Sequence, residues 1–88
     1  MKAKLKEAFI KDIKIIRKKT REKIEDFIFH IVPEVDSIIE LKNVKKISGY
    51  TNYYRIRFGD YRVGFEHRED KIVFYRALHR KDIYRYFP

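Results

Sequence analysis

Residues 52–66 read NYYRIRFGDYRVGFE, and this stretch decides the fold. Side chains alternate between the two faces of a β-strand, so residues two positions apart share a face. The apolar and aromatic residues of the stretch follow that spacing: Tyr54, Ile56, Phe58, Tyr61, Val63 and Phe65. Gly59 and Asp60 between them are typical of a two-residue hairpin turn. The stretch therefore predicts two antiparallel strands, 53–58 and 61–67, that share one apolar face.

The opposite face of these two strands carries three arginines, Arg55, Arg57 and Arg62. An ordinary solvated sheet face mixes Thr, Ser, Glu and Lys, so this arginine-rich face indicates an anionic ligand. A guanidinium group suits phosphate because its fork pairs two oxygens at once and stays charged.

The N-terminal part of the chain predicts a strand and two amphipathic helices. Residues 2–6 alternate weakly between apolar and charged side chains and could form a first strand. From about 7 to 18 the apolar residues change to helical spacing. A second helix is expected to begin near Thr20, an acceptable N-cap, and to end at Pro33. Its apolar stripe repeats at i, i+3, i+4 and i+7: Ile24, Phe27, Ile28 and Ile31.

The C-terminal part predicts a third strand and a final helical turn. Residues 36–49 are interpreted as a connection that could contain a helical turn. A short turn at Glu69-Asp70 leads to a strand over 71–78, which completes an antiparallel meander, and a helical turn follows over about 80–86. Two helices can cover only one face of such a sheet. We therefore expect an α+β fold in the order β-α-α-β-β-β, with two N-terminal helices on one face, a short C-terminal helix, and an open, concave arginine face.

Composition indicates one basic domain spanning residues 1–88. The 88 residues include 22 Lys and Arg against 13 Asp and Glu, a net charge of +9, and the sequence pI is about 9.8. Such a charge is typical of a polyanion binder, with nucleic acid the leading partner and an anionic membrane or acidic protein the next. The absence of cysteine excludes a disulfide scaffold and a Cys-based zinc site. With no signal peptide or long apolar run, we expect a cytoplasmic protein without membrane, metal or cofactor.

Three motifs carry a resemblance to a known family: YRIR at 54–57, GDYRV at 59–63 and HRKDIY at 79–84. In spacing they resemble the RelE/ParE toxin superfamily, and specifically its RelE branch of ribosome-dependent mRNA interferases. The resemblance implies a small curved antiparallel sheet with two N-terminal helices on its convex side. It also implies binding of mRNA in the ribosomal A site, where the ribose 2′-hydroxyl attacks the adjacent phosphate to leave a 2′,3′-cyclic phosphate. A type II toxin–antitoxin system is implied with it.

Carried across residue by residue, the resemblance assigns phosphate binding to Arg55 and Arg57 and catalysis to Arg62, Arg80 and Tyr84. Cleavage of RNA by its own 2′-hydroxyl needs a base, positive charge at the phosphorane oxygens, and help for the leaving 5′-oxygen. The best-known members carry lysines in the first meander strand, whereas an arginine holds its proton at any physiological pH.

The identity of the base is therefore left open. An arginine nest would favour the phenolate of Tyr84, whereas His79 titrates near neutrality without help. A third possibility is that the protein supplies mainly charge and geometry. Two further residues also have open roles. Arg76 shares strand parity with Arg80 and could contact phosphate or solvent, and Tyr53 could stack on a base or shield the sheet.

Two alternative functions compete with the nuclease: a ParE-like, non-nuclease toxin that acts on DNA gyrase, and an inactive basic RNA-binding module. For a toxin, the partners expected besides ribosome and mRNA include a cognate antitoxin that is small, acidic and helical. Ile83, Tyr86 and Phe87 look too hydrophobic for a free terminal turn, so we expect them to form an exposed apolar edge on which this antitoxin packs.

Overall fold

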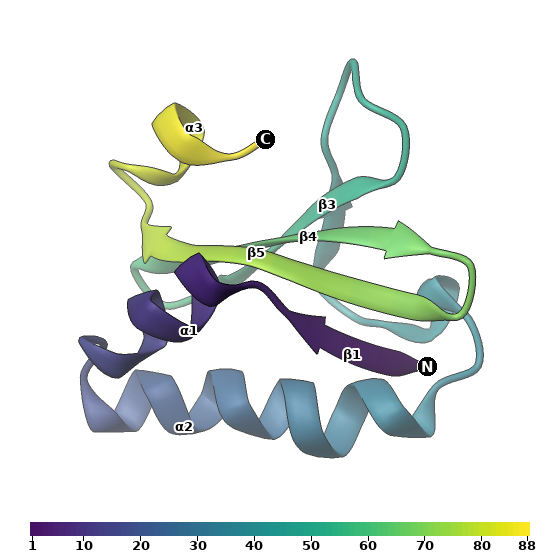
Figure 1. Cartoon of the computed structure of the whole chain (residues 1–88), viewed down its shortest axis with the longest axis horizontal. Coiled ribbons are helices and arrows are strands. Elements are labelled where there is room, and N and C mark those ends of the chain that lie inside the picture. The colour runs from purple at the N-terminus through teal and green to yellow at the C-terminus, as the bar shows by residue number, and fades with distance from the viewer.

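A five-stranded sheet lies at the centre of the computed structural model, which describes residues 1–88 (Figure 1). Its strands are β1 (Lys2–Leu5), β2 (Val44–Lys46), β3 (Tyr53–Phe58), β4 (Tyr61–Arg68) and β5 (Lys71–His79). They lie in the order β1-β5-β4-β3-β2, and every pair is antiparallel except β1 with β5, which is parallel. The predicted meander is confirmed, with strand limits that agree to within one residue. The α+β class is confirmed too.

One strand, β2, was not predicted, because 36–49 was interpreted as a connection. Its three residues pair with β3, and Lys45 lies opposite Arg55. A strand of three residues is too short for alternation to be visible in the sequence, and it exists here because the edge of β3 offers hydrogen-bonding partners. The helical turn considered for this segment is present as a 3-10 helix, η3 (Ile38–Glu40), which is capped by Ser37.

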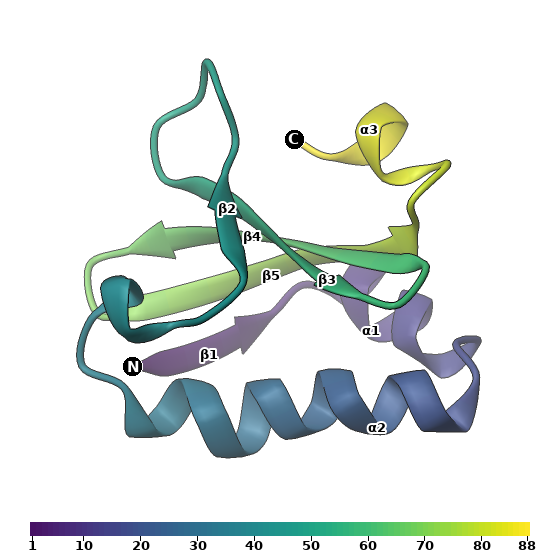
Figure 2. The ribbon, with the colours of Figure 1, turned by 180° about the vertical axis from the view of Figure 1, so that it is seen from behind.

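Two helices cover one face of the sheet, as expected. They are α1 (Glu7–Lys14) and α2 (Lys18–Asp26). The second continues without a break through a π-helical turn, η1 (Phe27–Ile31), and a 3-10 turn, η2 (Val32–Glu34). Both lie on the same side of the sheet, and the short α3 (Ile83–Tyr86) lies on the other (Figures 1 and 2). The main core fills the space between sheet and helices, and its largest members are Phe9, Phe65 and Phe74. None of the helices is both long and apolar enough to cross a membrane.

The second helix differs from its prediction at both ends. Its N-cap is Arg17, and Thr20 lies inside the first turn. At the other end Ile31 is 42% exposed, whereas Val32 is fully buried. A π turn takes one residue more than an α turn, so η1 rotates the chain and moves Val32 into the place predicted for Ile31.

The arginine side of the sheet is partly covered by the C-terminal segment, which corrects the expected exposed edge. Ile83 and Phe87 are only 2% and 4% exposed, and Tyr86 alone remains open at 54%. The ring of Phe87 lies over Gly64, where a Cβ would come within 2.3 Å of it. The rest of this face lies between two projections that rise on the side away from α2: the β2–β3 loop and α3 (Figures 1 and 2).

Candidate nucleic-acid interface

A groove of about 650 Å³ opens on this side of the sheet. Its lining combines residues of β2, β3, the hairpin turn, β4 and α3: Asn43, Val44, Lys45, Arg55, Arg57, Gly59, Arg62 and Tyr84. Four of the eight side chains are cations, and none is acidic. The site has no group of three or more His, Cys, Asp or Glu side chains that could hold a metal ion. An anion is therefore the ligand that this groove fits.

The strand register concentrates charge in the groove. Arg57 on β3 lies directly opposite Arg62 on β4. Arg62 donates from Nη1 to the carbonyl oxygens of Gly59 and Tyr61, at 2.9 and 3.0 Å. These bonds fix one arm of the guanidinium against the hairpin turn, and its other N–H groups have no protein partner. The predicted convergence of Arg55, Arg57 and Arg62 is therefore seen in the structure.

Tyr84 reaches the groove from α3. Arg55 donates from Nη1 to the Tyr84 hydroxyl, and its Cζ lies 5.0 Å from the centre of the Tyr84 ring. The tyrosine is 65% exposed, so its hydroxyl is open to a ligand. Arg55 is therefore a cation paired with a hydrogen-bond acceptor, the Tyr84 hydroxyl, at the edge of the arginine cluster.

The structure does not bring His79 to this groove. In the β4–β5 register His79 pairs with Tyr61, and the two rings lie 5.8 Å apart, edge to face. Tyr61 packs against the helix-side core, which places His79 on that side too. Its Nδ1 accepts a hydrogen bond from the Lys81 N–H at 3.2 Å. Of the two base candidates, only Tyr84 lies in the groove.

Arg80 lies beside the groove without lining it. Its backbone N–H donates to the Asp60 carbonyl at 2.8 Å, which ties the chain after β5 to the β3–β4 turn. The side chain is exposed and makes no ion pair. Arg80 is therefore free to reach a ligand that extends past the turn.

Neither role predicted for Arg76 describes what the structure shows. Its Nε and Nη2 donate to the two carboxylate oxygens of Asp12 at 2.7 and 3.0 Å. These hydrogen bonds raise the pKa of the Arg76 guanidinium. Asp12 also accepts from the backbone N–H of Ala77 at 2.9 Å. Asp12 accepts from two of the guanidinium N–H groups, so Arg76 belongs to a structural ion pair, and it does not line the groove.

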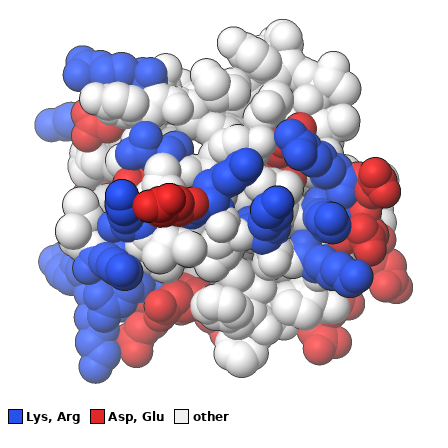
Figure 3. Space-filling model, viewed as in Figure 1, with Lys and Arg blue, Asp and Glu red and all other residues white.

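Tyr53 packs among other aromatic rings on this face of the sheet. It is half-buried, and its ring lies 5.6 Å from Phe87, 5.9 Å from Tyr50 and 6.1 Å from Tyr75. Tyr50, at the projecting β2–β3 loop, is the exposed aromatic ring next to it. The loop, residues 47–52, contains no charged side chain and forms part of the white area above the basic side chains in Figure 3.

Lys45 and Asn43 also line the groove, and sequence reasoning missed them because it missed β2. The basic run of Lys42, Lys45 and Lys46 was the signal available. Only the pairing of Lys45 with Arg55 shows which of these lysines adjoins the arginines.

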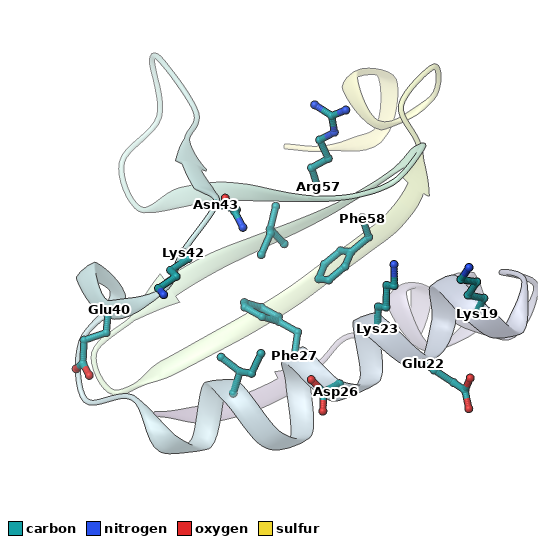
Figure 4. A pocket seen from close by; sticks show the side chains of 12 residues that line it. Lys19, Glu22, Lys23, Asp26, Phe27, Glu40, Lys42, Asn43, Arg57 and Phe58 are labelled. Carbon is teal, nitrogen blue, oxygen red and sulfur yellow. The ribbon is translucent and has the colours of Figure 1, made fainter.

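A second groove, of about 840 Å³, lies between α2 and the β2–β3 edge (Figure 4). Its floor is apolar, with Phe27, Ile31, Ile56 and Phe58, and its rim carries both acidic and basic side chains. Arg57 borders both grooves. A mixed rim over an apolar floor fits a protein segment better than a phosphate chain.

Comparisons with known proteins agree with this fold. The sequence model of a family described as "ParE toxin of type II toxin-antitoxin system, parDE" matches residues 3–84. Toxin RelE3 of Methanocaldococcus jannaschii is 46% identical over 89 residues, and the alignment covers 100% of both chains.

Solved structures are similar as well. A chain of the RelB-RelE antitoxin-toxin complex from Methanococcus jannaschii is 44% identical, with a TM-score of 0.81 over 97% of this chain and 99% of that one. The toxin-antitoxin complex RelBE2 from Mycobacterium tuberculosis matches at 16% identity and a TM-score of 0.70, over 89% and 95% of the two chains. The RelE-RelB complex from Pyrococcus horikoshii OT3 matches at 23% identity and a TM-score of 0.61, over 90% of this chain and 93% of that one. The last two likenesses concern the fold alone.

Proposed function

Because the chain belongs to the RelE/ParE toxin family and is a RelE-type toxin of a type II toxin–antitoxin system, we propose that it is an endoribonuclease that cleaves mRNA in the ribosomal A site. The observation that carries this proposal is the contact between Arg55 and the Tyr84 hydroxyl in a groove that also holds Arg57 and Arg62. Cleavage would stop translation, which accounts for toxicity.

The proposed reaction uses the RNA as its own nucleophile. The 2′-hydroxyl oxygen loses its proton and forms a bond to the adjacent phosphorus while the bond from phosphorus to the 5′-oxygen breaks. The 5′-oxygen takes a proton from solvent water, leaving a 2′,3′-cyclic phosphate and a 5′-hydroxyl. Negative charge grows on the non-bridging oxygens, and Arg57 and Arg62 are the cations that would stabilise it. A charge contact of this kind is worth about 100- to 1000-fold in rate.

Tyr84 is the proposed acceptor of the 2′-hydroxyl proton. Arg55 contacts its hydroxyl oxygen, and the exposure of the ring leaves that oxygen open to the ribose. Arg80, beside the turn, would contact a neighbouring phosphate or the leaving group. The protein's contribution is then one proton acceptor and a set of cations, with the message held in register by the ribosome.

A second candidate function is supported by the family model, which is described as ParE. A ParE-like toxin that acts on DNA gyrase would use the same fold without cleaving RNA. Such a protein has no evident need for a phosphate-sized cluster of cations around an open tyrosine, so the groove favours the nuclease.

We also propose that the toxin is neutralised by a small acidic antitoxin. The similar chain from M. jannaschii is solved in a RelB–RelE complex, and a charge of +9 would attract an acidic, initially disordered chain. Since Ile83 and Phe87 are already buried, a partner helix must displace α3 to reach them. The alternative place is the apolar floor of the second groove, next to Arg57.

Primer extension on a translated mRNA after induction of the toxin tests the proposal. Cuts in phase with codons are expected from the wild type and are expected to disappear in Arg62→Ala. DNA breaks with intact mRNA would instead select the gyrase toxin, and neither kind of damage would leave only an RNA-binding module.

A further inference from the structure

The helix that carries Tyr84 cannot hold its own position. α3 contains four residues, and its N-cap, Asp82, makes no side-chain capping bond. One α-helical bond closes it, from the Phe87 N–H to the Ile83 carbonyl at 2.9 Å. A helix this short is unstable in isolation, so the place of Tyr84 in the groove depends on what α3 packs against.

Besides the contact between Arg55 and Tyr84, two kinds of contact attach α3 to the sheet. Ile83 and Phe87 are the apolar anchors, and both are buried. The third contact is polar: the Arg76 guanidinium lies against the ring of Tyr86, with its Cζ 5.3 Å from the ring centre. Tyr86 is two residues from Tyr84, so this contact acts on the turn that presents the Tyr84 hydroxyl to Arg55.

Arg76 is itself rigidly placed. The register passes from Gly64 opposite Arg76 to Phe65 opposite Phe74, which leaves Tyr75 without a partner in a β-bulge. Bulges re-aim side chains and are frequent beside active sites. The bulge also lets both Phe74 and Ala77 face the main core.

Asp12 completes the support from the other side. β1 pairs with β5 only as far as Phe74, so the Ala77 N–H lies on an edge that no strand covers. Asp12 accepts from that N–H and from Nε and Nη2 of Arg76, and the Asp12 side chain is only 10% exposed against 26% for Arg76. A partly buried, bidentate pair bonded to the backbone gives the guanidinium one orientation.

We propose that Arg76 is a positioning residue for the nuclease reaction: held by Asp12, it fixes α3 through the ring of Tyr86 and so sets the Tyr84 hydroxyl against Arg55. Arg76 has no place in the groove itself. The part of the proposal that concerns catalysis rests on the proposed function, whereas the hold on α3 does not.

Tyr86 offers a cleaner test than Arg76, because removing Arg76 would leave Asp12 buried without its partner. Tyr86→Leu removes the ring that the guanidinium contacts, and Tyr86→Phe is the matched control that keeps the ring. In single-turnover cleavage of ribosome-bound mRNA, we expect Tyr86→Leu to be about 3- to 30-fold slower, with Tyr86→Phe close to the wild type. The ribosome concentration that half-saturates the rate should not change.

A double variant separates positioning from a general loss of structure. If Tyr86 acts through Tyr84, then Tyr84→Phe combined with Tyr86→Leu loses no more rate than Tyr84→Phe alone. Losses that multiply would overturn the proposal, and so would a Tyr86→Leu variant as fast as the wild type.

The hydrogen-exchange rate of the Phe87 amide measures how firmly α3 is attached to the sheet, and the measurement needs no RNA. We expect exchange to be faster in Tyr86→Leu and unchanged in Tyr86→Phe, with equal stability of both in urea. Equal exchange rates in both variants would contradict the proposal that the Arg76–Tyr86 contact fixes α3. If the wild type cleaves no mRNA while Tyr86→Leu loosens α3, the proposed nuclease function and the catalytic role of Arg76 are both wrong. The proposal that Arg76 fixes α3 is then still supported.

Discussion

Arg57 on β3 and Arg62 on β4 occupy directly opposed positions of the sheet, so two guanidinium groups face the same groove side by side. Like charges directly across a strand pair destabilise a sheet by about 0.2–1 kcal/mol. The protein therefore keeps a pair that weakens its fold. The same positive potential that makes the two arginines repel each other would attract a phosphate.

Replacing Arg57, the member of this pair that does not share the bonds of Arg62 to the turn, should therefore stabilise the protein. Arg57→Thr is expected to raise the free energy of unfolding by about 0.2–1 kcal/mol, and the gain should shrink as salt screens the repulsion. Urea unfolding at low and high ionic strength measures both effects. Arg68→Thr is the matched control, because Arg68 has an acidic partner, Glu66, at 2.9 Å and its loss should stabilise nothing. No gain in Arg57→Thr would contradict the idea that the pair repels.

Arg62→Ala should abolish mRNA cleavage and leave the fold intact. We expect a loss of about 100- to 1000-fold, equal to about 2.7–4 kcal/mol of transition-state stabilisation. Its bonds to the Gly59 and Tyr61 carbonyls add a stability cost of about 1 kcal/mol, which urea unfolding will show separately. Arg68→Ala, on the same strand but outside the groove, should keep its activity. A fully toxic Arg62→Ala would rule out the phosphate clamp.

Tyr84→Phe should cost far more activity than His79→Gln, because only Tyr84 lies in the groove. The measurement is the single-turnover cleavage rate of each purified variant on programmed ribosomes. A greater loss in the histidine variant would reverse the assignment of the base. Similar small losses in both would mean that the cations and the ribosome supply nearly all of the catalysis.

The Tyr75 hydroxyl should lose its proton only at strongly alkaline pH. Burial, then the hydrogen bond from its hydroxyl to Glu66 Oε1 at 2.7 Å, raise the pKa of Tyr75 from 10.0 to about 12. A pKa above the unfolded value means stability that is complete below about pH 10 and is lost as pH rises toward about 12. Phenolate absorbance against pH reveals the late group. In Glu66→Gln the carboxylate charge is gone, so Tyr75 should titrate at lower pH. An unchanged titration curve would show that burial alone raises the pKa of Tyr75.

Gly64→Ala should disable the toxin through α3. The added Cβ would lie 2.3 Å from the Phe87 ring, which must move and take the helix with it. We expect a loss of stability of about 1–3 kcal/mol and a larger loss of cleavage, since Tyr84 leaves the groove with α3. Combining Gly64→Ala with Phe87→Ala should restore part of the stability but not the cleavage rate. An active Gly64→Ala would show that Tyr84 does not depend on this packing.

Local features of the chain were readable from the sequence because backbone geometry imposes their spacing. Alternation in 53–67 predicted the hairpin, its apolar face and the convergence of Arg55, Arg57 and Arg62, all of which the structure shows. Two of the three short motifs that predicted the family, YRIR and GDYRV, lie within this hairpin.

Contacts between distant segments were decided only by the tertiary structure. Arg76 and Asp12 are 64 residues apart, and no spacing rule joins them. The strand β2 forms only because β3 offers an edge, and the π turn that replaces Ile31 with Val32 is likewise invisible to a stripe read at 3.6 residues per turn. His79 and Tyr84 look equivalent along the chain. The register beside Tyr61 places His79 on the helix side, and the packing of Phe87 on Gly64 folds Tyr84 over the arginines. Periodicity reports the face of an element on which a side chain lies, but pairing and packing between elements determine which side chains meet.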